Sequence, residues 1–181
     1  MIDLADVRKG FRSVIGALFA VTVTGLALAE PVTQKCEEIG GLEIIGELEY
    51  VSFIPEDTRL KARIDTGAQT SSLSITDKKL FERDGRKWIR FHVHDAMKNE
   101  LVEFERLLKR SAKIKRHEAE AIERPVVELK IRLGKTEVKR EFTLADRSDF
   151  EYPVLIGRNV LANNFVVNVI HKFSTSNIEE Q

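Results

Sequence analysis

The sequence has very little cysteine: Cys36 is the only one among 181 residues. A single thiol forms no intrachain disulfide and no Cys-rich metal site. Cys36 lies in the polar stretch EPVTQKCEEIGG, and it does not directly follow the apolar run, as a lipid-attachment cysteine would. We interpret it as a free or intermolecular thiol.

An excess of charge of one sign is also lacking. The 29 basic and 29 acidic residues cancel, so no overall field attracts the chain to nucleic acid or anionic lipid. The contents of hydrophobic residues (43%) and charged residues (32%) are those of a soluble globular protein. A length of 181 residues suits one domain with a sizeable core.

Several enzyme signatures are missing. The chain has no G-x-x-x-x-G-K-[ST] loop for phosphates, no H-E-x-x-H zinc motif and no G-x-S-x-G nucleophile elbow. His92 and His94 are two positions apart in a predicted strand and face the same side, which a metal site could use. No third ligand is identifiable, so we interpret them as exposed strand residues and predict neither a metal nor another cofactor.

A long apolar run occurs only near the N-terminus. The basic stretch VRKGFR precedes roughly 17 mostly apolar residues, which end in the small-x-small pattern Ala27-Leu28-Ala29. This order predicts a signal peptide over residues 1–29, cleaved after Ala29. An uncleaved membrane anchor is the alternative, because the run is at the short limit for a spanning helix; a core helix is the least favoured. Both leading interpretations place the folded part outside the cytoplasmic membrane, in the periplasm or secreted.

The rest of the chain has the pattern of short strands. Apolar and polar residues alternate in several segments, and Asp-Gly and Gly-Lys pairs lie at two hairpin turns. Strands about every 8 to 12 residues with little helix predict an all-β fold, a small barrel or sandwich. After a linker over 30–41, the strands are expected at 42–54, 59–65, 71–76, 87–94, 125–133, 136–145, 152–157 and 165–170, with one helical turn after Gly157.

Residues 95–124 are ambiguous. Their charges and leucines are compatible with a helix, but the stretches LVEFERL and AKIKRH alternate between apolar and polar residues. We predict two exposed strands there. Basic side chains in this segment would favour acidic peptides, although a solvated charged hairpin explains them equally well: Lys109, Arg110, Lys113, Lys115 and Arg116.

The stretch ARIDTGAQTSSL carries the strongest chemical signal. Two aspartates held about 3 Å apart can hydrolyse an amide, because they cannot both ionise: one acts as base on water and the other as acid. Such a site needs a hydroxyl residue to fix the loops and a glycine for close approach. Asp65, Thr66 and Gly67 provide this set, followed by Ala68. The alternative is that Asp65 is only a turn residue.

Together, IDTGA and the downstream VLIGRNVL resemble the retropepsins, the single-lobed aspartic proteases of retroviral type. More narrowly, ARIDTGAQTSSL, RPVVELKIRLG and EFTLADRSDFEYPVLIGRNVL are similar to the bacterial retropepsin-like family often labelled ATP-dependent zinc proteases. The resemblance implies a small closed β-barrel with one short helix near the C-terminus. It implies a protease domain over residues 42–171 and a C-terminal tail over 172–181.

The resemblance also implies roles for individual residues. Asp65 is the expected catalytic aspartate, Thr66, Gly67 and Ala68 complete its loop, and Gly157 with Arg158 forms a turn that supports the loop. One position departs from the viral pattern. Gln69 stands where those relatives have an acidic residue that pairs with the arginine, so we expect Arg158 to bind another partner or the substrate.

Asp-Thr-Gly occurs once in the sequence, so a carboxylate pair requires a two-fold homodimer in which each subunit contributes Asp65. Residues 95–124 are then the candidate flap over a peptide or protein substrate. Two alternatives remain open. One is a non-catalytic peptide-binding module on the same fold. The other is a metal-assisted amide hydrolase that uses His92 and His94.

Overall fold

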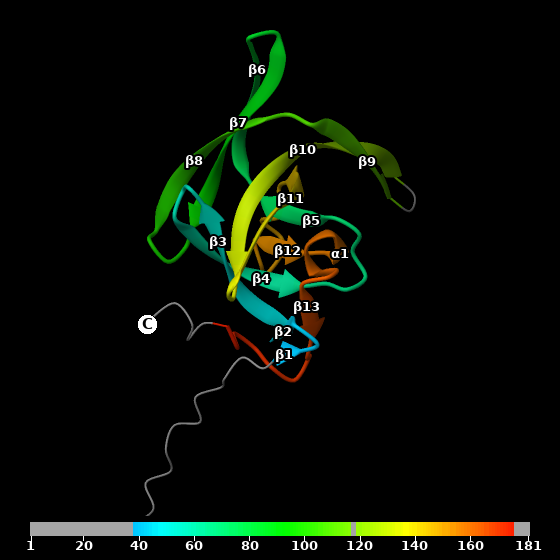
Figure 1. The fold of residues 1–181 in the computed structure, drawn as a ribbon. Helices are drawn as coiled ribbons and strands as arrows, with labels where there is room; N and C mark the ends of the chain where they lie inside the picture. The colour runs from blue at the N-terminus through cyan, green and yellow to red at the C-terminus, as the bar shows by residue number, and fades with distance from the viewer. Residues whose placement is uncertain (1–37, 117–118, 176–181) are drawn as a thin grey trace, which may run out of the picture. The chain divides into compact units, whose positions relative to one another are not determined.

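Six strands close into a β-barrel that carries the candidate site (Figure 1). The computed structural model describes residues 38–116 and 119–175, so the predicted signal peptide and Cys36 lie outside the described residues. The closed order is β11-β5-β12-β4-β3-β10, with β10 pairing back onto β11, which confirms the predicted all-β barrel. The strands are β3 (Leu48–Ile54), β4 (Thr58–Ile64), β5 (Ser71–Ser74), β10 (Ala119–Leu133), β11 (Thr136–Ala145) and β12 (Val154–Ile156).

Alternation along the strands determines which side chains fill the barrel. In β4, Leu60, Ala62 and Ile64 are buried, whereas Lys61 and Arg63 between them are exposed. This is the two-residue period that the sequence predicts for this strand. The same alternation places the apolar side chains of β3, β10 and β11 inside, so one continuous core fills the barrel.

A second sheet packs its apolar face against the barrel core. It consists of β6 (Thr76–Arg83), β7 (Arg86–Asp95) and β8 (Glu100–Leu107). The turn between β6 and β7 is Asp84-Gly85, and both residues have positive φ, 53° and 68°, as the predicted two-residue hairpin requires. Phe104 of β8 contacts Phe53 of the barrel edge-to-face at 6.0 Å.

Two strands are present within residues 95–124, as the sequence predicts, but the first of them is not an isolated exposed strand. The first strand is β8, which pairs along its whole length with β7 and buries Phe104 completely. Only β9 (Arg110–Arg116) and the start of β10 form a separate hairpin. The prediction missed β8's partner because alternation alone does not show which neighbour covers the apolar face. Residues 117–118 at the hairpin tip lie outside the described residues.

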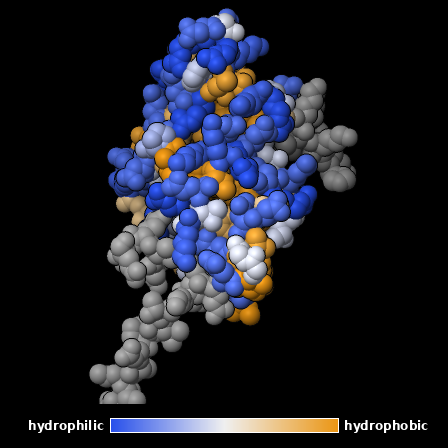
Figure 2. Space-filling model, viewed as in Figure 1, coloured by the Kyte–Doolittle hydropathy of each residue, from blue (hydrophilic) through white to orange (hydrophobic). Residues whose placement is uncertain are grey.

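The two ends of the described chain meet in a small third sheet. Its order is β1-β2-β13, with β1 (Glu38–Ile39), β2 (Leu42–Ile45) and β13 (Phe165–Val167). The predicted strand 42–54 is split at Gly46, where a Cβ atom would lie 2.4 Å from the carbonyl oxygen of His171. Figure 2 shows a mostly hydrophilic face with a hydrophobic area at its lower edge, near β13. Ile39, Val169 and Ile170 are exposed apolar residues of this end.

One short helix, α1 (Arg158–Leu161), follows β12, as the sequence predicts. Val160 and Leu161 are buried, so α1 is anchored on the barrel core. Within the described part of the chain, no helix has the length and apolar character needed to span a membrane.

A buried carboxylate holds the C-terminal segment onto the barrel. Glu49 is fully buried, and its oxygens accept hydrogen bonds from the amides and hydroxyls of Ser174 and Thr175. It also accepts the amide of Gly46 at 2.7 Å. The charge is therefore compensated by neutral donors from two segments that are far apart in sequence.

Replacing Glu49 with glutamine should lower the free energy of unfolding by about 2 kcal/mol or more, because charge-assisted bonds are lost and an amide group faces backbone donors. Urea unfolding measures this, with Glu82→Gln as the control, since Glu82 is exposed on β6. Equal urea midpoints for the Glu49→Gln and Glu82→Gln variants would contradict a main role for Glu49 in holding the C-terminal segment on the barrel.

Candidate functional site

Strand β4 delivers Asp65 to the candidate site. β4 pairs in parallel with β12, where Ile64 lies opposite Ile156. The amide of Asp65 continues this ladder by donating to the carbonyl oxygen of Ile156 at 2.9 Å. Asp65 is therefore fixed at its backbone where the strand ends, and its side chain is half-buried.

The loop after Asp65 curls around one of its carboxylate oxygens. Oδ1 accepts the amide of Gly67 at 2.8 Å and the amide of Ala68 at 3.1 Å. Among the residues that the structure describes, no hydrogen bond reaches the other oxygen, Oδ2. Two backbone donors thus orient the carboxylate and leave one oxygen available. Thr66 and Gly67 are exposed at the tip of this loop.

The turn at residues 157–159 binds the same loop from the other side. The amide of Arg158 donates to the carbonyl oxygen of Ala68 at 2.8 Å, and the amide of Asn159 donates to that of Gln69 at 3.1 Å. The amide of Gly157 donates to Ser71 Oγ at 3.0 Å. Three successive amides of one loop therefore bind the other loop.

Gly157 makes this close approach possible. It is buried, and a Cβ atom at its position would lie 2.9 Å from the carbonyl oxygen of Ala68 and 3.0 Å from the carbonyl carbon of Thr70. These contacts are with backbone, which cannot rotate away as a side chain can. Its φ of −99° is open to any residue, so the requirement for glycine is one of space.

The partner of Arg158 is backbone. Its guanidinium donates to the carbonyl oxygens of Thr66 (3.1 Å) and Gly67 (2.7 Å). The sequence leaves Arg158 without the acidic partner of the viral pattern, because Gln69 stands in that position. The structure accounts for the substitution, since the arginine ties the tip of the Asp65 loop without an acidic side chain.

The sequence did not identify two residues that join the Asp65 loop to the 157–159 turn, Ser71 and Asn159. Asn159 Oδ1 accepts both the amide and the hydroxyl of Ser71, at 2.9 and 2.8 Å. Its amide nitrogen donates to the carbonyl oxygen of Glu141 on β11 at 2.8 Å. Ser71 and Asn159 are 88 positions apart. The only available signal was their place next to the Asp65 and Gly157 motifs.

A pocket of about 480 Å³ opens beside the Asp65 loop. Arg147, which the sequence analysis also missed, is 8% exposed in its wall. Burial lowers the pKa of Arg147, the nearby Arg124 lowers it further, and the negative charge of Asp65 opposes both. The lining consists of Ala68, Gln69, Thr70, Ser72, Arg110, Ala112, Arg124, Thr143, Arg147 and Leu155.

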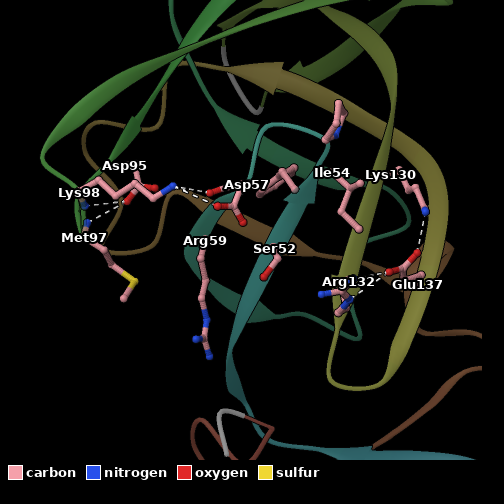
Figure 3. Close-up of a pocket in the computed structure, with 12 residues that line it drawn as sticks. Ser52, Ile54, Asp57, Arg59, Asp95, Met97, Lys98, Lys130, Arg132 and Glu137 are labelled. Carbon is pink, nitrogen blue, oxygen red and sulfur yellow. Dashed lines mark hydrogen bonds and ion pairs between the residues drawn. The ribbon is translucent and has the colours of Figure 1, made fainter. Parts of the chain in front are cut away.

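A larger pocket of about 830 Å³ lies elsewhere on the barrel (Figure 3). It lies between the turn after β3, the turn after β7 and the β10–β11 arm, and no residue of the Asp65 loop or of the 157–159 turn lines it. Asp95 there accepts the amides of Met97 and Lys98, and Glu137 pairs with Lys130 and Arg132. We assign no role in the Asp65 chemistry to this pocket.

The histidine pair lies on β7. His92 and His94 point to the outer face of the sheet, as the two-residue spacing predicts, while Phe91 and Val93 are buried. His92 lies 3.8 Å from Glu103 and 4.0 Å from Asp77. Within residues 38–116 and 119–175, no group of three or more acidic, histidine or cysteine side chains is arranged to hold a metal ion.

Comparisons with known proteins agree with this geometry. The family model "RimB-like: Retropepsin-like aspartic endopeptidase RimB" matches residues 44–177. A Legionella pneumophila crystal structure, described as a protein of unknown function, superposes with a TM-score of 0.64 at 32% identity, over 73% of this chain and 97% of that one.

Two curated relatives carry a different name, "Probable alpha-L-glutamate ligase". The protein from Shewanella pealeana is 30% identical over 72% of this chain, and the one from Desulfotalea psychrophila is 31% identical over 70%. The matches cover only 29% and 28% of the relatives. The chain thus spans less than a third of the length of these proteins.

Replacing Arg158 with glutamine should loosen the tip of the Asp65 loop, because the bonds to Thr66 and Gly67 are lost. Hydrogen exchange at the amides of Gly67 and Ala68, followed by NMR, should accelerate roughly tenfold, as the loss of about 1 to 2 kcal/mol predicts. Arg86→Gln, at the exposed start of β7, is the charge-matched control. Unchanged exchange in Arg158→Gln would show that the guanidinium does not hold the loop.

Proposed function

Because the chain belongs to the RimB-like family of retropepsin-like aspartic endopeptidases, we propose that it hydrolyses peptide bonds with water activated by Asp65. The observation that carries this proposal is the fixed carboxylate of Asp65. Its Oδ1 is held by two backbone amides, and its loop is tied to the 157–159 turn. A side chain oriented in this way is suited to chemistry that depends on the exact placement of one oxygen.

The reaction needs two such carboxylates sharing one proton. The ionised carboxylate takes a proton from water as the water oxygen attacks the carbonyl carbon, while the protonated carboxylic acid gives its proton to the carbonyl oxygen. The C–N bond of the resulting diol then breaks as the carboxylic acid gives its proton to the nitrogen and the ionised carboxylate takes a proton from a diol hydroxyl, so the pair is left with one proton again. The shared proton belongs to the pair, so no protonation state is assigned to either aspartate separately.

The second carboxylate comes, in this proposal, from a second copy of the chain. The printed sequence carries one Asp-Thr-Gly, and a two-fold homodimer places two copies of Asp65 on one axis. The end of the molecule formed by the β1-β2-β13 sheet supports such a contact. Val169 is 69% exposed and Ile170 is 83% exposed there, and large exposed apolar side chains are typical of interaction surfaces.

We also propose that the domain lies outside the cytoplasmic membrane. The basic, apolar and small-x-small order of residues 1–29 supports export of the domain to the periplasm or the exterior. We do not propose glutamate ligase activity for this chain, since it spans less than a third of the relatives that carry that name.

The full chain should cleave members of a mixed peptide library, and Asp65→Asn should abolish cleavage by removing a carboxylate that must act as acid or base. Cleavage should survive a chelator, since the chemistry uses no metal. Asp84→Asn is the matched control, because Asp84 lies in an exposed hairpin turn and asparagine tolerates its positive φ. Loss of cleavage with the chelator would instead support metal-assisted hydrolysis through His92 and His94.

Mixing wild-type and Asp65→Asn chains tests the shared site. In an exchanging dimer that needs both carboxylates, an equal mixture should retain about one quarter of the activity, because random pairing leaves one quarter of the dimers intact. Independent monomers would retain one half. Measured initial rates after equilibration distinguish these values, and a result of one half would overturn the dimeric dyad while leaving hydrolysis itself in place.

A further inference from the structure

The pocket of about 830 Å³ on the barrel lies over the outer face of β3, between two walls (Figure 3). Val51 and Phe53 of β3 point into the core, so by alternation Ser52 and Ile54 point outward into the pocket. The turn after β7 forms one wall and the β10–β11 arm the other: Asp95, Met97 and Lys98, and Lys130, Arg132 and Glu137. No residue of the Asp65 loop lines this pocket, so it is distinct from the Asp65 site.

One carboxylate oxygen in the first wall is buried without a partner. Asp95 is the last residue of β7 and is fully buried. Its Oδ1 accepts the amides of Met97 at 2.9 Å and of Lys98 at 3.1 Å, whereas Oδ2 has no hydrogen-bond partner among the described residues. A carboxylate oxygen is an acceptor, and its burial without a donor costs free energy. The group that Oδ2 lacks is therefore a hydrogen-bond donor.

The other acidic side chains of the pocket have cationic partners. Glu137 pairs with both Lys130 and Arg132, each at 2.6 Å, and Asp57 pairs with Lys98 at 3.7 Å. In the described part of the chain, no donor meets the second oxygen of Asp95. A buried carboxylate is stabilised most by a donor that carries a positive charge, which favours an ammonium group over a hydroxyl group.

Four basic side chains also line the pocket, but they are already engaged. The ion pairs just described hold three of them, and Lys98 Nζ also donates to the carbonyl oxygen of Asp57 at 2.6 Å. The fourth, Arg59, has its guanidinium carbon 4.7 Å from the centre of the Tyr50 ring. Because positive charges surround it, the pocket suits a single ammonium group better than a polycation.

The pocket has an apolar part as well. Met97, two residues after Asp95, is 62% exposed and lines the pocket together with Ile54 and Pro55. Such side chains can pack against an alkyl chain while the charge at the end of that chain is bound elsewhere. An apolar lining beside a buried carboxylate matches an alkylammonium group, which is the chemistry of a lysine side chain.

We propose that this pocket binds an alkylammonium group, with the charge on Asp95 Oδ2 and the alkyl chain against Ile54 and Met97. A small amine and a lysine side chain of another protein share this chemistry. The site is separate from Asp65, and binding there requires no hydrolysis.

Titration of the full chain, followed by NMR, tests the site, because the amides of Met97 and Lys98 are bonded to Asp95. The probes are an acetylated and amidated lysine peptide, the same peptide with ε-acetyllysine, and n-butylammonium. Both amide signals should shift saturably with the lysine peptide. Its affinity should exceed that of the acetyllysine peptide at least about tenfold, as a charge-assisted bond predicts. Equal affinity for butylammonium identifies a small amine as the ligand, and much weaker binding of butylammonium identifies a protein lysine.

Asp95→Asn should bring the lysine-to-acetyllysine affinity ratio close to one, since asparagine keeps an oxygen for the two amides but loses the charge. Met97→Ser should weaken binding of both peptides, because it removes part of the apolar lining from an exposed position. Asp84→Asn, in the β6–β7 turn, is the control and should preserve the ratio. Asp65→Asn should also preserve it, which separates this site from the proposed hydrolysis.

Absence of saturable shifts at Met97 and Lys98, or equal affinity for the two peptides, would overturn the proposal. A preference for lysine that a folded Asp95→Asn protein retains would do the same, and thermal unfolding shows whether each variant is folded. If Asp95→Asn does not fold, Met97→Ser decides, because unchanged affinities in that variant would contradict binding in this pocket. Hydrolysis at Asp65 is tested independently by the loss of cleavage in Asp65→Asn.

Discussion

The candidate site depends on the contact between two backbone segments, the loop after Asp65 and the turn at residues 157–159. Successive amides of the turn bind Ser71 Oγ and the carbonyl oxygens of Ala68 and Gln69. This spacing is possible because Gly157 has no side chain, and the neighbouring atoms are backbone. Orientation of the Asp65 carboxylate follows, since Ala68 is held through its carbonyl oxygen while its amide holds Asp65.

The topology brings these distant segments together. β12 lies between β4 and β5, parallel to the first and antiparallel to the second. The loop that leaves β4 and enters β5 must therefore pass the end of β12, where Gly157 follows. Because three adjacent strands fix both ends of the loop and the start of the turn, little conformational entropy remains to be lost when the site forms. Arg158 then secures the exposed tip through Thr66 and Gly67.

The local features of this structure could be predicted from the sequence, and the long-range ones could not. Alternation in β4, the Asp84-Gly85 turn and the short helix after Gly157 each depend on a few adjacent residues. The burial of Phe104 and the bonds between Ser71 and Asn159 depend on which segments meet in space. Gln69 illustrates the difference. In the sequence, the uncharged Gln69 leaves Arg158 without the ion pair of the viral pattern. In the fold, two backbone carbonyl oxygens take the place of that partner for Arg158.

Arg147 poses an energetic question that the barrel alone does not answer. A buried guanidinium that stacks on Phe150 and faces Arg124 is costly, because burial and a like charge both disfavour its ionised form. An apolar side chain of similar size would fill the space at lower cost. Natural proteins break such rules most often at functional sites. The negative charge of Asp65 is the only contribution that opposes this lowering of the pKa of Arg147, so the ionised form of the arginine is favoured by the carboxylate of the candidate site beside it.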